Sequence, residues 1–227
     1  MKSLQTMPQD GAEPAGGAGS GRNAETGGAA DSSRAAESGR ASEAGAAAES
    51  GLPTGPAGGD RPEGGSEAGR YWQERLEAHP GLEGVGYLGL GRRYNAWLYR
   101  VRRYVFLRAL RSLDLPMGDL RVLDVGSGTG FYVDLLQRAG ARGVKGVDIA
   151  EAAVSRLERR FPDGRFHCLD IAAGLGTLSE GGFDLVTCCD VLFHVVDDRD
   201  FERAVGNLAR LLADDGTLIL MDNLLPG

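Results

Sequence analysis

Short apolar runs alternate with amphipathic segments between Leu120 and Met221. Runs rich in Val, Leu, Ile and Phe predict buried strands, and apolar positions three or four residues apart predict helices. The expected strands are Arg121–Val125, Val144–Asp148, Arg165–Leu169, Phe183–Cys189 and Thr217–Met221. The expected helices are Phe131–Ala139, Ala150–Phe161 and Arg199–Ala213. This alternation predicts an α/β fold, a Rossmann-like parallel sheet flanked by helices.

A longer helix is expected before this region, because apolar side chains recur at helical spacing up to Pro116. The apolar positions are Tyr94, Trp97, Leu98, Val101, Val105 and Leu110. The other face carries seven arginines and no acid: Arg92, Arg93, Arg100, Arg102, Arg103, Arg108 and Arg111. We interpret the arginines as a solvated helix face. The alternative is an anion-binding cap over an active site.

Residues 1–70 have a different composition, with 16 glycines, 15 alanines and no Val, Ile or aromatic residue. Such a segment buries too little apolar surface to offset the cost of ordering the backbone, roughly 1 to 2 kcal/mol per residue. We therefore expect a disordered low-complexity tail over residues 1–70. One domain should follow over residues 71–227, and its first part, residues 71–115, should form a helical cap.

Charge and cysteine content limit the partners and the location. Residues 71–227 carry 19 basic and 22 acidic side chains, so we expect no nucleic-acid partner. Cys168, Cys188 and Cys189 are odd in number and lack C-x-x-C spacing, which disfavours disulfides and a metal site. A cytoplasmic location fits these thiols best. No apolar run is long enough to predict a membrane span.

The most informative segment is Asp124–Gly130, where a buried strand enters a glycine turn and then a helix. Glycine permits positive φ and lets a ligand lie close to the main chain. Asp148 ends the next strand, 22 residues after Gly126. A carboxylate there can accept hydrogen bonds from both hydroxyls of a ribose, so the two features together predict an adenosine site.

The glycine spacing distinguishes two kinds of adenosine ligand. A dinucleotide fingerprint reads G-x-G-x-x-G and binds a pyrophosphate, whereas Gly126, Gly128 and Gly130 are spaced G-x-G-x-G and follow Asp124. An acid aimed at the pocket opposes a phosphate and suits an ammonium group, which S-adenosylmethionine carries. A nicotinamide-dependent oxidoreductase is the less favoured alternative.

At these motifs the sequence resembles the class I S-adenosylmethionine-dependent methyltransferases of the small-molecule type, over about residues 85–225. The motifs are Asp124–Gly130, Gly146–Ile149, His167–Ile171 and Phe183–Val186 leading to Asp190. The resemblance implies a sheet with strand order 3-2-1-4-5. It also implies S-adenosylmethionine as the cofactor and a small molecule as the methyl acceptor.

Carried over by position, the resemblance implies a set of cofactor-binding residues. They are Asp124, Gly126, Ser127, Gly128, Gly130, Asp148, Ile149, Asp170, Ile171 and Asp190. The glycine loop would hold the methionine portion, with Asp124 facing its ammonium. Asp148 would hold the ribose, and Ile149 would pack on the adenine face. Asp170, with the backbone of Ile171, would read the adenine edge.

Each candidate side chain also has a simpler interpretation. Asp170 could cap the following segment, and Asp190 could be a plain loop acid at the end of the fourth strand. His194 is the candidate catalytic base if the acceptor must lose a proton, with packing as the alternative. A metal site joining His167 to the later cysteines fails in the implied strand order. The third and fourth strands would then lie three spacings of about 4.8 Å apart, and the cysteines are expected in the core.

The family sheet implied by the resemblance has seven strands, but the sequence ends shortly after the fifth. We therefore expect the last hairpin to be missing and the fifth strand to expose an edge capable of self-association. The leading hypothesis is methyl transfer from S-adenosylmethionine to a small-molecule acceptor. The alternative is a truncated, catalytically incomplete domain that binds the nucleoside or a partner without turnover. The acceptor and the methylated atom stay open, because variable loops build acceptor pockets in this architecture.

Overall fold

Five strands form one parallel sheet in the computed structural model, which describes residues 66–222. The strands are β1 (Val122–Val125), β2 (Lys145–Asp148), β3 (Arg165–Cys168), β4 (Phe183–Cys189) and β5 (Leu212–Met221). Their order across the sheet is β3-β2-β1-β4-β5, and every neighbouring pair is parallel. The predicted Rossmann-like sheet and its strand order are confirmed.

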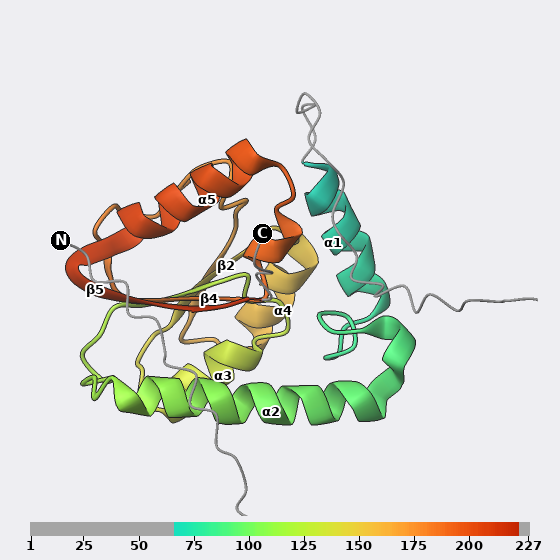
Figure 1. Cartoon of the computed structure of the whole chain (residues 1–227), viewed down its shortest axis with the longest axis horizontal. Helices are drawn as coiled ribbons and strands as arrows, with labels where there is room; N and C mark the ends of the chain where they lie inside the picture. Colours follow the sequence, from blue (N-terminus) through green and yellow to red (C-terminus); the bar gives the residue numbers. More distant parts are fainter. Residues whose placement is uncertain (1–65, 223–227) are drawn as a thin grey trace, which may run out of the picture. The chain divides into compact units, whose positions relative to one another are not determined.

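Helices cover both faces of this sheet (Figure 1). One face packs against α2, α3 and α4 through a core that includes Phe106, Leu136 and Leu157. The other face packs against α5, with Leu208 and Leu211 in a second core. The helices are α1 (Glu67–Ala78), α2 (Gly91–Ser112), α3 (Phe131–Arg138), α4 (Glu151–Arg160) and α5 (Asp198–Leu211), with short 3₁₀ helices η1 (Leu88–Leu90) and η2 (Leu192–His194).

Helix α1 is anchored to the start of α4. The side chain of Gln73 accepts a hydrogen bond of 2.9 Å from the backbone N–H of Ala152, and Leu76 is buried against this helix. The helix begins at Glu67, four residues before the boundary expected at Tyr71. Residues 1–65 of the predicted tail lie outside the described residues.

Helix α2 does not bury the face that the sequence pattern indicated. Trp97, Val101 and Val105 were expected in the core, but they are exposed at 54%, 41% and 41%. Of the predicted apolar positions only Leu110 is buried, and the other buried side chains of the helix are Asn95, Tyr99 and Phe106. The prediction failed because apolar and basic residues alternate around this helix, so either side offered an apolar stripe at helical spacing. The buried stripe contains Tyr99 and Phe106, whose rings pack against Phe131 and Tyr132 of α3.

Strand β5 begins five residues before the predicted start at Thr217. Leu212 pairs with Phe183 and Thr217 pairs with Leu185, so the predicted turn Asp214–Gly216 lies inside the strand as an irregularity. The extra residues bulge between these two pairs, after which regular pairing resumes. The other predicted strands and helices of the sheet region end within two residues of the observed ones.

Candidate functional site

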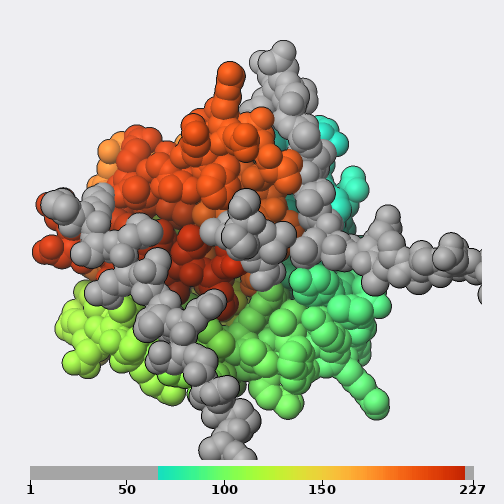
Figure 2. All heavy atoms as spheres, viewed as in Figure 1, coloured from blue at the N-terminus to red at the C-terminus, as the bar shows by residue number. Residues whose placement is uncertain are grey.

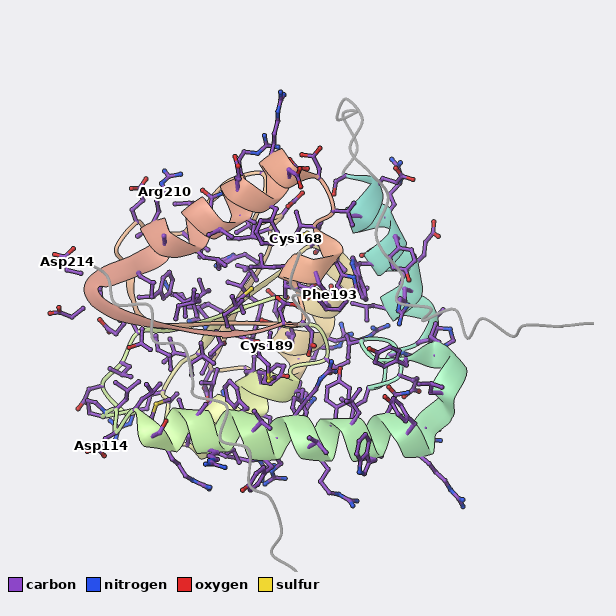
Figure 3. All side chains as sticks on the ribbon, in the orientation of Figure 1. Asp114, Cys168, Cys189, Phe193, Arg210 and Asp214 are labelled. Carbon is purple, nitrogen blue, oxygen red and sulfur yellow. The ribbon has the colours of Figure 1, made fainter. Side chains whose placement is uncertain are left out.

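A cavity of about 420 Å³ lies at the carboxyl ends of β1, β2 and β4. This is the edge of an open α/β sheet at which ligands bind. Cys189 at the end of β4 and Phe193 just beyond it mark this region in Figure 3. Side chains from α1 and α2 complete the wall, among them Trp72 and Tyr99. The sheet and the helical cap therefore build the cavity together.

The loop after β1 presents bare main chain to the cavity. Gly126, Ser127 and Gly128 line it, and the two glycines have φ of 74° and 49°. A Cβ on Gly126 would lie 2.2 Å from the side chain of Val191, so no larger residue fits there without displacement. The loop is fixed from behind, because the N–H groups of Gly126 and Ser127 both donate to the carbonyl oxygen of Val147, at 2.8 and 3.0 Å.

Asp148 holds the glycine loop and also faces the cavity. Its Oδ2 accepts a hydrogen bond of 2.7 Å from the N–H of Gly128, and its Oδ1 accepts one of 2.9 Å from the N–H of Ala150. Burial raises the pKa of this carboxyl, and the two backbone donors oppose the rise. Each carboxylate oxygen has a second lone pair. Asp148 can therefore accept hydrogen bonds from a ligand without releasing the loop.

Asp124 does not line the cavity, although the sequence placed it facing a ligand ammonium. It is 1% exposed in β1, where its Oδ1 accepts a 2.6 Å hydrogen bond from the hydroxyl of Thr187. Its Oδ2 is buried without a hydrogen-bond partner among the described residues. Burial raises the pKa of Asp124 to about 7, and the hydrogen bond from Thr187 opposes the rise. The carboxyl therefore lies inside the sheet and not on the cavity wall.

Gly130 also lies outside the cavity wall. It precedes α3 with φ of 78°, and a Cβ there would lie 2.5 Å from the ring of Phe161. Its role in the structure is therefore close packing of the loop against the end of α4.

The segments that follow β2 and β3 contribute the residues predicted to contact adenine. Ile149, Asp170 and Ile171 all line the cavity. Asp170 also caps the turn that follows, because its Oδ1 accepts a 2.9 Å hydrogen bond from the N–H of Ala172. Asp170 therefore both caps this turn and lines the cavity. The carbonyl oxygen of Ile171 accepts a 2.7 Å hydrogen bond from Asn207 of α5, which fixes this segment.

Asp190 follows β4 in a left-handed conformation, with φ of 59°. Its Oδ1 lies 2.5 Å from Nη2 of Arg102, a partner that the sequence analysis had placed on the solvated face of α2. The hydroxyl of Tyr132 lies 3.4 Å from Oδ2. Burial raises the pKa of Asp190, and the Arg102 charge opposes the rise. Asp190 lines the cavity, and its first structural role is to join α2 to the sheet.

His194 lies on the cavity wall in η2. Its ring meets Trp72 of α1 edge-on, with centroids 4.8 Å apart, and lies 3.8 Å from the ring of Phe193. Sequence reasoning missed the aromatic wall opposite, where Tyr99 and Tyr132 also face the cavity. Aromatic residues at helical spacing are usually interpreted as core residues. Their position on the cavity wall follows only from the packing of α1 and α2 on the sheet.

The cysteines divide between core and surface. Cys188 and Cys189 are buried at 0% and 4% exposure, as expected. Cys168 is exposed on the edge strand β3, because no further strand among residues 66–222 pairs with β3, so its predicted core position was wrong. Within the described part of the chain, no group of three His, Cys, Asp or Glu side chains could hold a metal.

Comparison with known proteins agrees with this geometry. Residues 122–216 match the family described as "Methyltransferase domain". The ubiquinone biosynthesis O-methyltransferase of Albidiferax ferrireducens is 35% identical over 100 residues, 42% of this chain and 39% of that protein. The enzyme of the same name from Neisseria meningitidis is 36% identical over 95 residues, 40% of each chain. The chain thus spans about two-fifths of the length of these curated relatives.

Two solved structures share the fold. Phosphoethanolamine N-methyltransferase 1 of Haemonchus contortus is 20% identical with a TM-score of 0.56, over 68% of this chain and 31% of that one. Magnesium protoporphyrin IX methyltransferase of Synechocystis, solved with bound SAM, is 24% identical with a TM-score of 0.50, over 67% and 74%. The sheet order and the glycine loop agree with the matched domain, and over residues 122–216 the chain is similar to S-adenosylmethionine-dependent methyltransferases of class I.

Proposed function

We propose that this chain transfers a methyl group from S-adenosylmethionine to a hydroxyl of a small-molecule acceptor. The observation that carries the proposal is the composition of the cavity wall. Main chain of Gly126 to Gly128 and the carboxylate of Asp148 line one part, and aromatic side chains from the helical cap line another. A nucleoside and an acceptor could therefore lie side by side in one cavity.

The residues present fit this cofactor. Asp148 keeps lone pairs for the ribose hydroxyls, and Ile149 and Ile171 offer apolar contact to the adenine. The buried Oδ2 of Asp124 has no hydrogen-bond partner within residues 66–222, and a cationic ligand bound at the adjacent loop would favour the ionised form of this carboxyl. When bound, the cofactor would supply an activated methyl group on a sulfonium. The chain would hold that ligand in place and exclude water from it.

The acceptor side of the cavity favours an aromatic or similarly flat molecule. Trp72, Tyr99 and Tyr132 supply ring faces and edges, and aromatic rings pack well against one another. The curated relatives are named as O-methyltransferases, which supports an oxygen as the methylated atom. A hydroxyl must lose its proton on methylation, and His194 is the histidine on the cavity wall. We assign it the role of general base.

Turnover by the full 227-residue chain tests this function. The assay follows tritium from methyl-labelled S-adenosylmethionine into extractable product, with catechol as the hydroxyl probe and benzylamine as the amine probe. We expect the methyl ether of catechol. His194→Gln should lower kcat by about a hundredfold and remove a step from the pH–rate profile, since a general base contributes roughly 10² to 10⁴.

The matched control is His167→Gln, on the exposed edge of the sheet, which should leave the rate unchanged. Transfer only to benzylamine would contradict the hydroxyl assignment. Bound cofactor without transfer to either probe would contradict the proposed turnover and favour a nucleoside-binding domain. An unchanged pH profile in His194→Gln would reduce His194 to a packing residue.

Location and self-association complete the proposal. A reducing cytoplasm suits the three free thiols, two of them adjacent and buried. Strand β5 lies at the edge of the sheet, and Leu220 on it is 42% exposed. An exposed strand edge favours pairing between copies, which light scattering at increasing protein concentration would detect as a dimer.

A further inference from the structure

The outer face of α2 combines exposed apolar side chains with arginines. Trp97 is 54% exposed, Tyr104 is 65% exposed, and Val101 and Val105 are each 41% exposed. Spacings of three and four residues place these side chains on one side of the helix. Leu90, directly before the helix, is 54% exposed and extends the patch. We call these five residues and the arginines beside them the α2 surface.

Helical spacing places Arg93, Arg100, Arg108 and Arg111 on the side of Trp97 and Tyr104. Arg92 and Arg103 lie on the flanks of this surface, and all six of these arginines are exposed. None has an ion-pair partner among residues 66–222. The seventh, Arg102, turns inward to Asp190. The sequence has no Asp or Glu between Glu83 and Asp114, so the surface is strongly positive on a chain whose net charge is −7.

The opposite side of α2 already has its partners. Asn95, Tyr99, Phe106 and Leu110 are buried within the fold, so the exposed apolar residues are not needed to attach the helix. In the space-filling view the green atoms of α2 lie at the molecular surface (Figure 2). Side chains project from the helix away from the sheet in Figure 3. The surface is therefore available to an external partner.

We propose that the α2 surface binds the headgroup region of an anionic lipid bilayer, with the helix lying parallel to the membrane. Exposed Trp and Tyr residues favour the interface between headgroups and acyl chains, and arginines beside them attract anionic headgroups. The aliphatic residues Leu90, Val101 and Val105 favour lipid over nucleic acid, because bases stack on rings and gain little from aliphatic side chains. No helix among the described residues is long and apolar enough to cross a bilayer.

Co-sedimentation of the full chain with sucrose-loaded vesicles tests the proposal. The vesicles contain either phosphatidylcholine alone or phosphatidylcholine with 30 mol% phosphatidylglycerol. We expect binding to the anionic vesicles only, weakened by raising the salt concentration, because screening shortens the reach of surface charge. Trp97→Ser/Tyr104→Ser should weaken binding at least fivefold, and Arg100→Glu/Arg108→Glu at least tenfold.

The controls remove an exposed apolar side chain and reverse two exposed arginines on other helices. Val205→Ser removes an exposed apolar side chain of α5. Arg159→Glu/Arg199→Glu reverses two exposed arginines of α4 and α5. Both controls should bind as the unchanged chain does.

Absence of binding to anionic vesicles, or equal loss in the controls and in the α2 variants, would overturn the proposal. A second result would also overturn it: single-stranded RNA displaces the chain from the vesicles, and vesicle binding is unchanged in Trp97→Ser/Tyr104→Ser. The assay contains no cofactor or acceptor, so its result does not depend on methyl transfer.

Discussion

Two buried aspartates, one on each of two neighbouring strands, have different hydrogen-bond environments. Asp148 is hydrogen-bonded to two backbone N–H groups and still faces the cavity. Asp124 has one hydroxyl partner, and its other oxygen is buried without one among residues 66–222. Unsatisfied buried oxygen favours the protonated form of a carboxyl, which is why burial raises the pKa of Asp124 to about 7.

The pKa of Asp124 predicts a pH dependence of stability. Its folded value of about 7 lies above the unfolded value of about 3.9. Between these values the folded state holds a proton that the unfolded state has released, so the free energy of unfolding falls as pH rises from about 4 to about 7. Asp124→Asn cannot titrate. We expect urea unfolding at pH 5, 6, 7 and 8 to show a shallower decline in this variant.

Other buried acids are common to both proteins, so the difference between the two curves isolates Asp124. The difference should grow up to about pH 7 and then stay constant. Parallel curves over the whole range would mean that Asp124 is ionised in the fold throughout.

Replacing glycine by alanine should have opposite effects on stability in the glycine loop and in α5. Gly126→Ala should cost at least about 1 kcal/mol of stability, because an L-residue at positive φ costs roughly 1 to 2 kcal/mol and the new Cβ meets Val191. Gly206→Ala, in α5 with open space around its Cα, should add about 0.5 to 1 kcal/mol. Thermal unfolding of both variants measures the contrast. Equal destabilisation would show that backbone conformation is not what selects glycine at position 126.

At the scale of elements, Arg102 joins α2 to the sheet and makes the cap part of the site. The side chains of Arg102 and Asp190 are only 12% and 15% exposed. Nη1 of Arg102 is also buried, without a partner within residues 66–222. Removing one member of a buried ion pair leaves the other charge buried without a partner. We therefore expect that breaking this pair costs more stability than the pair contributes when it forms.

A double-mutant cycle tests this connection. Arg102→Met should destabilise the fold by about 3 kcal/mol, and the added change Asp190→Asn should restore much of that loss. Arg121→Met is the matched control, because Arg121 pairs with Asp184 on the surface at 57% and 30% exposure. It should destabilise the fold far less than Arg102→Met does, because exposed ion pairs contribute little to stability. Additive effects of Arg102→Met and Asp190→Asn would mean that the two residues are not coupled.

The elements of the sheet region could be predicted because their signals are local. Strand runs and turn residues lie within each segment, and only β5 differed, where a bulge absorbs the turn Asp214–Gly216. The orientation of α2 could not be predicted, because its sequence offers two apolar stripes. The stripe containing Tyr99 and Phe106 is buried because it meets Phe131 and Tyr132 of α3, contacts that no local pattern encodes.

At the scale of the whole molecule, the cofactor side of the site was predictable and the acceptor side was not. The glycine loop and Asp148 lie on consecutive elements whose spacing follows from the parallel sheet. The aromatic wall depends on α1, which reaches the sheet region through contacts such as Gln73 with Ala152. Trp72 therefore contacts His194, which lies 122 positions later in the sequence. The hydrophobic pattern of the sequence does not predict this contact.

Cofactor binding should be measured on the full 227-residue chain. Isothermal titration calorimetry with S-adenosylhomocysteine should show one site per chain. Asp148→Ala should weaken binding about a hundredfold or more, because it removes charge-assisted hydrogen bonds of roughly 1.5 to 3 kcal/mol each. Asp163→Ala, in the exposed turn after α4, should bind as the unchanged chain does. Absence of binding by the unchanged chain, or equal affinity in a folded Asp148→Ala variant, would contradict the account.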